Sequence, residues 1–451
     1  MEPFEGKTPG TLGPISVSTR LRRIAELARK APKMVFTTLA HHIDIDLLRV
    51  AHGRTRKDGA AGVDGQTAEE YARDLEGNLR SLLERFKSGR YQAPPVKRVH
   101  IPKGEGQTRP IGMPTFEDKV LQRAVAMILE AVYEQDFLGS SYGFRPGRSA
   151  HQALEALRQG LMDMRGGVVL ELDIQKFFDT LDHGHLRNFL DQRVRDGVLR
   201  RAIDKWLSAG VLEEGCVVYP ESGSPQGGVI SPILSNIYLH EVLDRWFEGV
   251  VKPHLRSKAF LVRYADDAVI AFVDETDAKR VLDALPKRFG KYGLTLHPEK
   301  TRLVRFRRPA LFSRGRKNRP ESFDFLGFTH HWAKSWRGVW VVKRRTARSR
   351  MARALKAVDA WMRQHRHLSL DKQREVLAQK LQGHYSYYGI TNNGRALGVF
   401  RYHVLRLWRY WLGRRSQRHR LTWENFHRLL KRYPLPLPRV VHSAYRSAAN
   451  P

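Results

Sequence analysis

Residues 258–273, KAFLVRYADDAVIAFV, place two adjacent aspartates between two short apolar runs. Both runs are rich in β-branched and aromatic residues, which predicts two strands that meet at a tight turn with Asp266 and Asp267 at its tip. An Asp-Asp pair is more often a turn or a helix cap than a metal site. Between two buried strands, however, adjacent like charges call for a counter-cation, and this context favours metal binding.

Residues 166–181, GGVVLELDIQKFFDTL, predict a second strand that carries an aspartate. Alternate apolar residues define one face: Val168, Leu170, Leu172 and Ile174. Glu171 and Asp173 fall on the other face. An aspartate that faces an aspartate pair on a neighbouring hairpin suits two Mg²⁺ ions about 3.5–4 Å apart, as phosphoryl transfer to a nucleotide requires. Because Mg²⁺, like its substitute Mn²⁺, prefers oxygen ligands, Asp173, Asp266 and Asp267 are the candidate catalytic metal ligands.

The chain has 451 residues and a net charge of +33, from 79 Lys or Arg and 46 Asp or Glu. The excess is concentrated in residues 331–451, where 27 basic and four acidic residues give +23, against +10 elsewhere. This asymmetry predicts an anionic polymer as partner, although solvated helix faces or an anionic membrane surface would leave the same pattern. Aromatic residues interleaved with the arginines favour a nucleic acid, and charge alone does not separate RNA from DNA.

Cys216 is the single cysteine, which excludes intramolecular disulfides and multi-cysteine zinc sites. The sequence has no run of about 18 apolar residues that would predict a transmembrane helix, and its N-terminus lacks the apolar core of a secretory signal. We therefore expect a cytosolic protein without a membrane partner.

The periodicity along the chain predicts an α+β body followed by a helical domain. Residues 1–34 contain Gly, Pro and a short basic amphipathic stretch, and we expect a partly ordered N-terminal extension. Residues 35–340 mix helices with short strands, including a helix within residues 116–137, where apolar residues recur every three or four positions. After Trp340 the pattern is helical throughout, so residues 341–451 are expected to form a basic helical domain with a short tail.

Seven sequence blocks make the chain recognisable. They are IPKGEGQTRPIGMPT (101–115), SSYGFRPGRSAHQAL (140–154), LELDIQKFFDTLDHGHL (170–186), GSPQGGVISPILSNIYL (223–239), VRYADDAVI (262–270), GLTLHPEKT (293–301) and DFLGF (324–328). In this order and spacing they resemble the reverse transcriptases encoded by bacterial group II introns, the intron maturases, from about Val50 to Pro438. The resemblance implies a right-hand polymerase fold. It also implies that fingers and a palm, built on an antiparallel sheet and helices, precede a helical thumb and RNA-binding domain. The expected location is the bacterial cytosol or nucleoid.

The resemblance also implies roles for individual residues. Asp173 and Asp266 match the metal-binding catalytic aspartates of the family, and Asp267 completes the YADD box. Lys103 and Arg109 match basic residues of the fingers that grip the incoming triphosphate. Two cations in the Gly-rich KGEGQTR stretch, between Pro-bounded extended segments, also suit phosphate oxygens on physical grounds, with an exposed basic hairpin as the alternative.

Three further residues are matched to nucleotide binding. Phe178 matches the bulky gate that clashes with a ribose 2′-hydroxyl, while a core role remains the alternative for one of Phe177 and Phe178. Gln226 matches a residue that contacts the incoming nucleotide, and Lys300 and the FLGF segment (325–328) match the sixth block and the primer-grip region of the family. Gln175 departs from the pattern, since many members carry Lys there, and this change leaves the metal ligands intact.

Contacts to nucleic acid are expected from arginines. Arg145, in YGFRPGRS, orders the fingers, touches the template or forms an internal salt bridge. The C-terminal candidates stand among aromatic residues, with Trp408 expected in the helical core: Arg401, Arg406, Arg409, Arg414 and Arg415. Arginine supplies phosphate contacts and aromatic rings offer faces to unpaired bases. The resemblance implies that this region clasps a template–primer duplex and structured RNA.

The sequence supports three hypotheses of function. The first is an Mg²⁺-dependent RNA-directed DNA polymerase that assists splicing and mobility of its group II intron RNA. Its partners would be that RNA, an RNA template with a DNA primer, dNTPs and target DNA. The second is a domesticated relative in DNA repair or phage defence, and the third is an RNA-binding maturase without polymerase activity. We recognise no C-terminal endonuclease, so we expect no cleavage of target DNA by this chain and a primer that comes from elsewhere.

Overall fold

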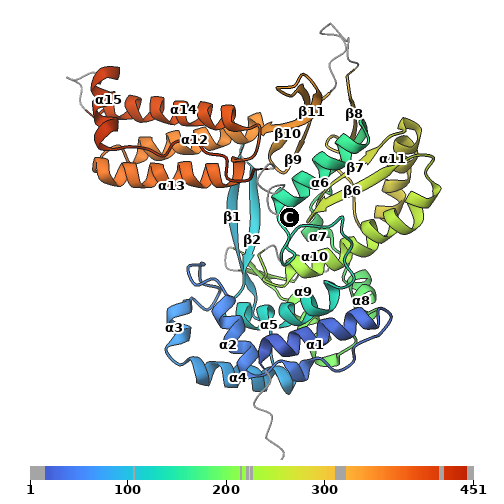
Figure 1. Ribbon diagram of the computed structural model, residues 1–451. Helices are drawn as coiled ribbons and strands as arrows, with labels where there is room; N and C mark the ends of the chain where they lie inside the picture. Colours follow the sequence, from blue (N-terminus) through green and yellow to red (C-terminus); the bar gives the residue numbers. More distant parts are fainter. Residues whose placement is uncertain are drawn as a thin grey trace, which may run out of the picture. The chain divides into compact units, whose positions relative to one another are not determined.

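The computed structural model describes residues 16–104, 107–213, 216–219, 223, 227–309, 321–415 and 421–443 (Figure 1). Internal contacts divide the chain into two units, which we describe separately. Unit 1 comprises Met1–Ser149, Glu171–Ile270 and Lys279–Arg302, and unit 2 comprises Ala150–Leu170, Ala271–Ala278 and Leu303–Pro451. The domain boundaries predicted near residues 34 and 340 follow the sequence pattern and not these internal contacts, and they stay predictions. Within the described residues, no helix is long and apolar enough to cross a membrane.

Helix α5 (Phe116–Tyr133) forms the centre of the helical part of unit 1. The Thr115 side chain accepts a hydrogen bond from the N–H of Asp118 and caps the helix. Of its 18 residues 13 are buried, so the predicted helix is confirmed and is enclosed on several sides. Four α-helices and the short 3₁₀ helix η1 (Ala40–His42) precede it among the described residues, and α1 and α2 pack on it. The four α-helices are α1 (Val17–Lys30), α2 (Ile45–Arg54), α3 (Ala68–Ala72) and α4 (Leu75–Lys87).

The two Pro-bounded segments of the sequence form a hairpin. Strand β1 (Val96–Gly104) pairs with β2 (Gln107–Met113) in antiparallel register. Strand β4 (Val211–Glu213) adds in parallel to β1, and β5 (Cys216–Val218) forms the outer edge, which gives the order β2-β1-β4-β5. The extended structure predicted for these segments is confirmed.

A second sheet carries both aspartate segments, in the order β6-β7-β3-β8. Its strands are β3 (Gly166–Leu172), β6 (Ala259–Tyr264), β7 (Asp267–Phe272) and β8 (Arg302–Arg307). The strand predicted in residues 166–181 is confirmed, but it is buried on both faces from Gly166 to Leu170. Toward its C-terminal end the predicted alternation is confirmed, because Leu172 and Ile174 are buried while Glu171 and Asp173 are half-buried. Strand β3 lies inside the sheet between β7 and β8. The mixed structure with antiparallel pairing confirms the α+β class.

Helix α6 (Ala150–Asp163) precedes β3 in the chain, and α11 (Glu275–Gly290) lies between β7 and β8. Four helices lie between β3 and β6: α7 (Phe177–Thr180), α8 (His183–Asp191), α9 (Gly197–Leu207) and α10 (Ser231–Leu239). Three short helical segments extend α10: η2 (His240–Asp244), η3 (Phe247–Val251) and η4 (Lys252–His254). Eight of the nine residues of α10 are buried, so this helix passes through the core of unit 1.

The C-terminal part of unit 2 begins with an antiparallel sheet in the order β11-β10-β9. It contains β9 (Phe323–Phe325), β10 (Phe328–Lys334) and β11 (Trp340–Thr346). The prediction that the chain is wholly helical after Trp340 is therefore wrong for β11. Seven residues of β11 pair with β10, and this pairing together with the adjacent Val341 and Val342 favours a strand.

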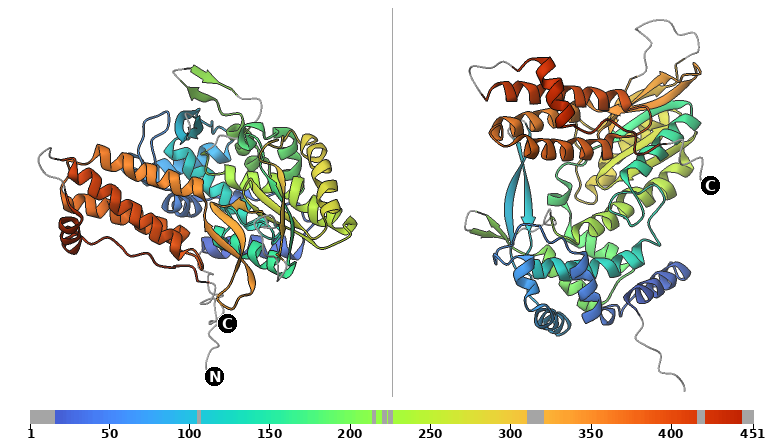
Figure 2. Two further views of the ribbon diagram at one scale, coloured as in Figure 1. Left: turned by 90° about the horizontal axis from the view of Figure 1, so that it is seen from above. Right: turned by 60° about the vertical axis from the view of Figure 1, so that its left-hand side comes forward.

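Four helices complete unit 2: α12 (Arg348–Gln364), α13 (Leu370–Tyr388), α14 (Gly394–Gly413) and α15 (Trp423–Arg432). Helices α12 to α14 lie side by side (Figures 1 and 2). Trp408 of α14 is fully buried, packs on Phe426 and donates its indole N–H to Gln373 at 2.9 Å. The prediction that Trp408 belongs to the core is confirmed.

Candidate active site

The turn between β6 and β7 presents Asp266. Ala265 and Asp266 form the turn, with Ala265 in the left-handed conformation at a φ of 57°. Asp266 is half-buried, whereas Asp267 is the first residue of β7 and is exposed. The predicted hairpin is confirmed. The prediction that both aspartates occupy its tip is wrong for Asp267, because the two-residue turn is complete before it.

A neighbouring segment fixes this turn through its backbone. The N–H of Arg263 donates to the carbonyl of Ser140 at 2.8 Å, and the N–H of Tyr142 donates to the carbonyl of Arg263 at 2.9 Å. A Cβ on Gly143 would lie 2.3 Å from the nitrogen of Ala265, so only glycine allows this approach. The SSYGF segment (140–144) therefore packs directly on the β6–β7 turn.

Arg263 links the turn to the core, although its side chain is fully buried. Its guanidinium bonds both carboxylate oxygens of Asp244, at 2.8 and 2.5 Å. The remaining nitrogen donates to Asn236 Oδ1 and to the carbonyl of Ala265, both at 3.0 Å. A buried charge is stable only when it is paired and hydrogen-bonded. The pair with Asp244 thus allows an arginine to hold the carbonyl that precedes Asp266.

Asp173 follows the end of β3 and is held by a second backbone contact. Its carbonyl accepts the N–H of His297 at 2.8 Å, and the next residue, Ile174, forms an antiparallel bridge with Leu296. This contact brings the nearby Lys300 to the site, with its Nζ 3.3 Å from Asp173 Oδ2. The residue that the resemblance matched to nucleotide binding therefore places its ammonium on a candidate catalytic carboxylate.

Asp173 and Asp266 come to the same edge of the sheet. Strands β3 and β7 are neighbours, and a Cβ on Gly167 would lie 2.0 Å from the carbonyl oxygen of Phe272. The start of β3 thus lies beside the end of β7, which makes the two strands antiparallel. Six residues lead forward from Gly167 to Asp173, and six lead back from Phe272 to Asp266. Since both strands advance about equally per residue, the two aspartates reach one edge together.

The chemistry of this pair fits a divalent metal ion. Asp173 is one-third exposed and already holds a cation, the Lys300 ammonium. Among the residues that the structure describes, no group of three or more His, Cys, Asp or Glu could hold a metal, so the three predicted aspartates do not form a ready-made cluster. Mg²⁺ commonly takes one or two carboxylates and completes its shell with water and substrate phosphates. The Asp173–Asp266 pair therefore suits a metal that binds together with a nucleotide.

The two phenylalanines of helix α7 differ in burial. Phe177 is 2% exposed and packs on Tyr238, so it is the core aromatic of the pair. Phe178 is half-buried. A Cβ on Gly223 would lie 2.8 Å from the carbonyl oxygen of Phe178, so the GSPQGG segment starts beside this residue. The role of Phe178 as a gate stays a prediction.

The structure describes the other predicted nucleotide-binding residues only in part. The side chain of Lys103 and the whole of Gln226 lie outside the described residues. Arg109 is exposed on β2. Gly227, which follows Gln226, has a φ of 115°, and a Cβ there would lie 2.4 Å from the carbonyl oxygen of Gly112. The end of the GSPQGG segment is therefore pressed against the same strand that carries Arg109.

Arg145 forms an internal salt bridge and internal hydrogen bonds. Its side chain is buried and pairs with the Glu134 carboxylate at 3.0 Å. A further nitrogen donates to the carbonyls of Leu138 and Ser141 at 2.7 and 2.8 Å. The internal salt bridge that the sequence left open is therefore what the structure shows. Because these donors point inward, we correct the predicted contact with nucleic acid to an internal ordering role.

Three of the five predicted C-terminal arginines hold unit 2 together. Their guanidinium groups donate to backbone carbonyls: Arg401 to Pro436 at 3.1 Å, Arg409 to Leu421 at 2.8 Å, and Arg415 to Leu368. The first two bonds tie the chain that follows α14 back onto that helix. These contacts give Arg401, Arg409 and Arg415 a structural role, whatever else they bind.

The other two arginines belong to an exposed row along α14 and its C-cap residue, Arg414, which we call the α14 stripe: Tyr402, Arg406, Tyr410 and Arg414. Residues four apart share one face of a helix. The Arg406 guanidinium lies 5.7 Å from the ring centre of Tyr402, and that of Arg414 lies 4.8 Å from Tyr410. Such alternating planar and cationic groups fit unpaired bases and phosphates.

Sequence reasoning missed a similar feature at the turn between β10 and β11. Trp336 is 84% exposed there, and the Arg337 guanidinium lies 4.7 Å from its ring centre. Gly338, with a φ of 75°, completes the turn. The signal was present as an aromatic–Arg–Gly sequence between two runs with strand character.

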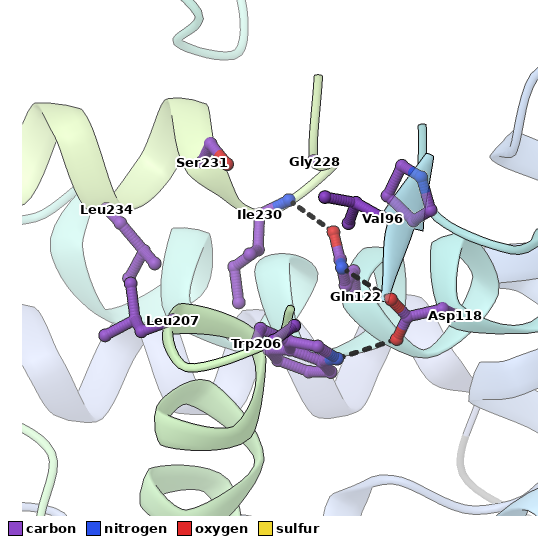
Figure 3. A pocket seen from close by; sticks show the side chains of 11 residues that line it. Val96, Asp118, Gln122, Trp206, Leu207, Gly228, Ile230, Ser231 and Leu234 are labelled. Atoms are coloured by element: carbon purple, nitrogen blue, oxygen red, sulfur yellow. Dashed lines mark hydrogen bonds between the residues drawn. The ribbon is translucent and has the colours of Figure 1, made fainter. Parts of the chain in front are cut away.

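Sequence reasoning also missed the buried polar pair of Asp118 and Gln122 in α5 (Figure 3). Gln122 Oε1 accepts the N–H of Val229 at 2.8 Å, close to the GSPQGG segment. The signal was two polar residues four apart on the apolar face of a helix, where burial without a partner would be costly.

Comparisons place this geometry among known proteins. Residues 101–330 match the model of the family described as reverse transcriptase (RNA-dependent DNA polymerase). Protein YkfC of Escherichia coli strain K12 is 37% identical over 237 residues, which are 46% of this chain and 62% of YkfC. The group II intron-encoded protein LtrA of Lactococcus lactis subsp. cremoris is 37% identical over 231 residues, 50% of this chain and 38% of LtrA. The nuclear intron maturase 2 of Arabidopsis thaliana mitochondria is 29% identical over 179 residues, 31% of this chain and 24% of that protein.

This chain spans less than two thirds of the length of each of these relatives. The family match, however, covers just over half of the chain and includes Asp173, Asp266 and Lys300. Reverse transcriptases depend in general on divalent metal ions, in agreement with the carboxylate pair. The chain therefore belongs to the reverse transcriptase (RNA-dependent DNA polymerase) family.

Proposed function

We propose that this chain is an RNA-directed DNA polymerase that binds group II intron RNA and assists the splicing and mobility of that RNA. The observation that best supports polymerase activity is the Asp173–Asp266 pair at one sheet edge, with Lys300 on Asp173. The resemblance to intron-encoded proteins supports the RNA partner. A binding-only maturase would have no use for the carboxylate pair, which argues against that alternative.

The reaction joins a primer 3′-hydroxyl to the α-phosphate of a dNTP and releases pyrophosphate. Two Mg²⁺ ions, when bound, lower the pKa of the hydroxyl and stabilise negative charge on the phosphates. Asp173 and Asp266 would hold these ions at the end of the sheet. Lys300 places a positive charge on Asp173 in the absence of these ions, and Arg109 on β2 would contact the triphosphate.

Phe178→Ala is expected to weaken discrimination against ribonucleotides by about tenfold, because removal of the ring opens space for a 2′-hydroxyl. The measurement is the ratio of kcat/KM for a dNTP to that for the matching rNTP. Phe177→Ala is the matched control: it empties a buried site and should cost about 3–5 kcal/mol of stability without changing the ratio. Equal ratios for wild type and Phe178→Ala would assign Phe178 to packing alone.

Arg406→Gln with Arg414→Gln is expected to weaken RNA binding and to reduce its salt dependence. Each phosphate contact contributes about 0.7 to the slope of log K against log salt for single strands, so the slope should fall by about 1.4. Affinity for a single-stranded RNA is measured between low and moderate salt. The control, Arg80→Gln with Lys87→Gln, removes two exposed charges from α4. An identical slope for both double variants would exclude the α14 stripe from the interface.

The RNA partner is tested by recovery of the RNA that is bound to the protein in its host, followed by sequencing. We expect a structured RNA that surrounds the reading frame of this chain. Recovery of RNAs without intron structure, together with active polymerase, would instead favour the domesticated role in repair or defence.

A further inference from the structure

A carboxylate is enclosed in unit 1 away from the sheet edge. Asp118 of α5 is 2% exposed and accepts three hydrogen bonds, as Figure 3 shows in part. The donors are the Tyr91 hydroxyl, the Trp206 indole N–H at 2.7 Å and the Gln122 side-chain amide at 3.0 Å. Burial raises the pKa of Asp118 to about 6, against the opposing effect of these donors. At neutral pH and above, Asp118 is therefore ionised and can only accept hydrogen bonds.

The side-chain amide of Gln122 connects Asp118 to the backbone of Val229 and Ile230. Its nitrogen donates to Asp118 Oδ2, and its oxygen accepts the N–H of Val229 at 2.8 Å and the N–H of Ile230 at 3.3 Å. Because Asp118 cannot donate, the amide must turn its NH₂ group toward Asp118 and its oxygen toward Val229 and Ile230. The carboxylate thus sets the orientation of the amide, and the amide holds two backbone N–H groups.

Those two N–H groups lie where the GSPQGG segment enters α10. Ile230 is the N-cap residue of α10 and its side chain makes no capping bond, so Gln122 supplies the acceptor for its N–H. Two residues before Val229, Gly227 is pressed on the carbonyl of Gly112 in β2. The chain that follows Gln226 is therefore fixed at Gly227 by β2 and at Val229 and Ile230 by Gln122.

We propose that Asp118 and Gln122 are positioning residues for the incoming nucleotide, acting through the backbone that follows Gln226. The proposal rests on the polymerase function proposed above. We call the hydrogen bonds that run from Asp118 through Gln122 to Val229 and Ile230 the relay. Loss of the relay is expected to weaken binding of the dNTP and to leave the candidate metal-binding aspartates and the α14 stripe unchanged. A merely structural role would lower stability and leave the KM for dNTP unchanged.

Gln122→Leu removes the amide and leaves the N–H groups of Val229 and Ile230 without their acceptor. We expect the KM for the complementary dNTP to rise about tenfold, the scale of one lost buried hydrogen bond, with a smaller change in kcat. Affinity for the template–primer should stay within about twofold, since phosphate contacts dominate it. KM is independent of the fraction of folded enzyme, so partial unfolding does not mimic this result.

A swap of the two side-chain types provides the sharpest control. Asp118→Asn alone turns an NH₂ group toward the NH₂ group of Gln122, and Gln122→Glu alone sets two carboxylates against each other. In the combination of Asp118→Asn with Gln122→Glu, the new amide donates to the new carboxylate, which still accepts the N–H groups of Val229 and Ile230. Tyr91 and Trp206 still find an acceptor in the amide oxygen at position 118.

The experiment measures steady-state incorporation of one dNTP by wild type, Gln122→Leu, both single swaps and the double swap, with thermal melting in parallel. We expect a raised KM for dNTP in the three single variants and a return to within about threefold of wild type in the double swap. Single variants that melt earlier but keep the wild-type KM, or a double swap no better than the worse single, would overturn the relay. An inactive wild-type chain would overturn the polymerase function itself, which is a distinguishable outcome.

Discussion

Asp173→Ala and Asp266→Ala are each expected to lower the rate of primer extension by about 10³-fold or more, while RNA binding stays close to that of wild type. The two carboxylates reach one edge of the sheet from adjacent strands. The charge they supply is required only where metal ions and the triphosphate meet, so their loss removes stabilisation of the transition state. Single-turnover extension of a labelled primer and filter binding of RNA measure the two effects separately.

Asp283→Ala is the control for this pair, because it removes an exposed carboxylate from α11. It should extend primers at the wild-type rate. Full activity in Asp173→Ala or in Asp266→Ala would contradict the assignment of the sheet edge as the catalytic site.

Arg263→Met is expected to reduce the free energy of unfolding by about 3–5 kcal/mol, because it leaves the Asp244 charge buried without its partner. Urea denaturation of unit-1 structure, followed by circular dichroism, measures this loss. The double variant Arg263→Met with Asp244→Leu should recover most of the stability, since apolar side chains can replace a buried ion pair.

Activity should behave differently from stability in that pair of variants. Arg263 also donates to the carbonyl of Ala265, which directly precedes Asp266, and the double variant does not restore this bond. We therefore expect a stable double variant with slow primer extension. A double variant with wild-type kcat would show that Arg263 serves stability alone, and a stable Arg263→Met single variant would contradict the buried-pair argument.

The parts of the fold that could be predicted are those with local signals. The apolar runs around Asp266 and the regular spacing in α5 each identify an element without knowledge of its neighbours. Asp267 was misplaced by one position because a two-residue turn can be drawn through ADD in more than one register. Strand β11 was missed because Val341 and Val342 are a short local signal, and its pairing with β10 completes the strand.

The supports of the site could not be predicted, because they depend on distant partners. Arg263 pairs with Asp244, 19 residues away, and Gln122 meets Val229, 107 residues away. The sequence also could not decide whether Arg145 binds nucleic acid or an internal partner. Only the position of Glu134 in the structure shows that Arg145 forms an internal salt bridge. Sequence patterns therefore identified the candidate catalytic groups, whereas the residues that hold these groups in place could be identified only from the packing.

Templated addition of a single nucleotide is the sharpest test of the proposed polymerase activity. A DNA primer annealed to an RNA template is mixed with the purified chain, Mg²⁺ and one dNTP at a time. We predict addition of the dNTP complementary to the template base, none with mismatched dNTPs at the same concentration, and none after chelation of Mg²⁺ or with Asp266→Ala. Absence of addition by the wild-type chain across RNA templates and salt concentrations, or addition that continues in Asp266→Ala, would contradict this account.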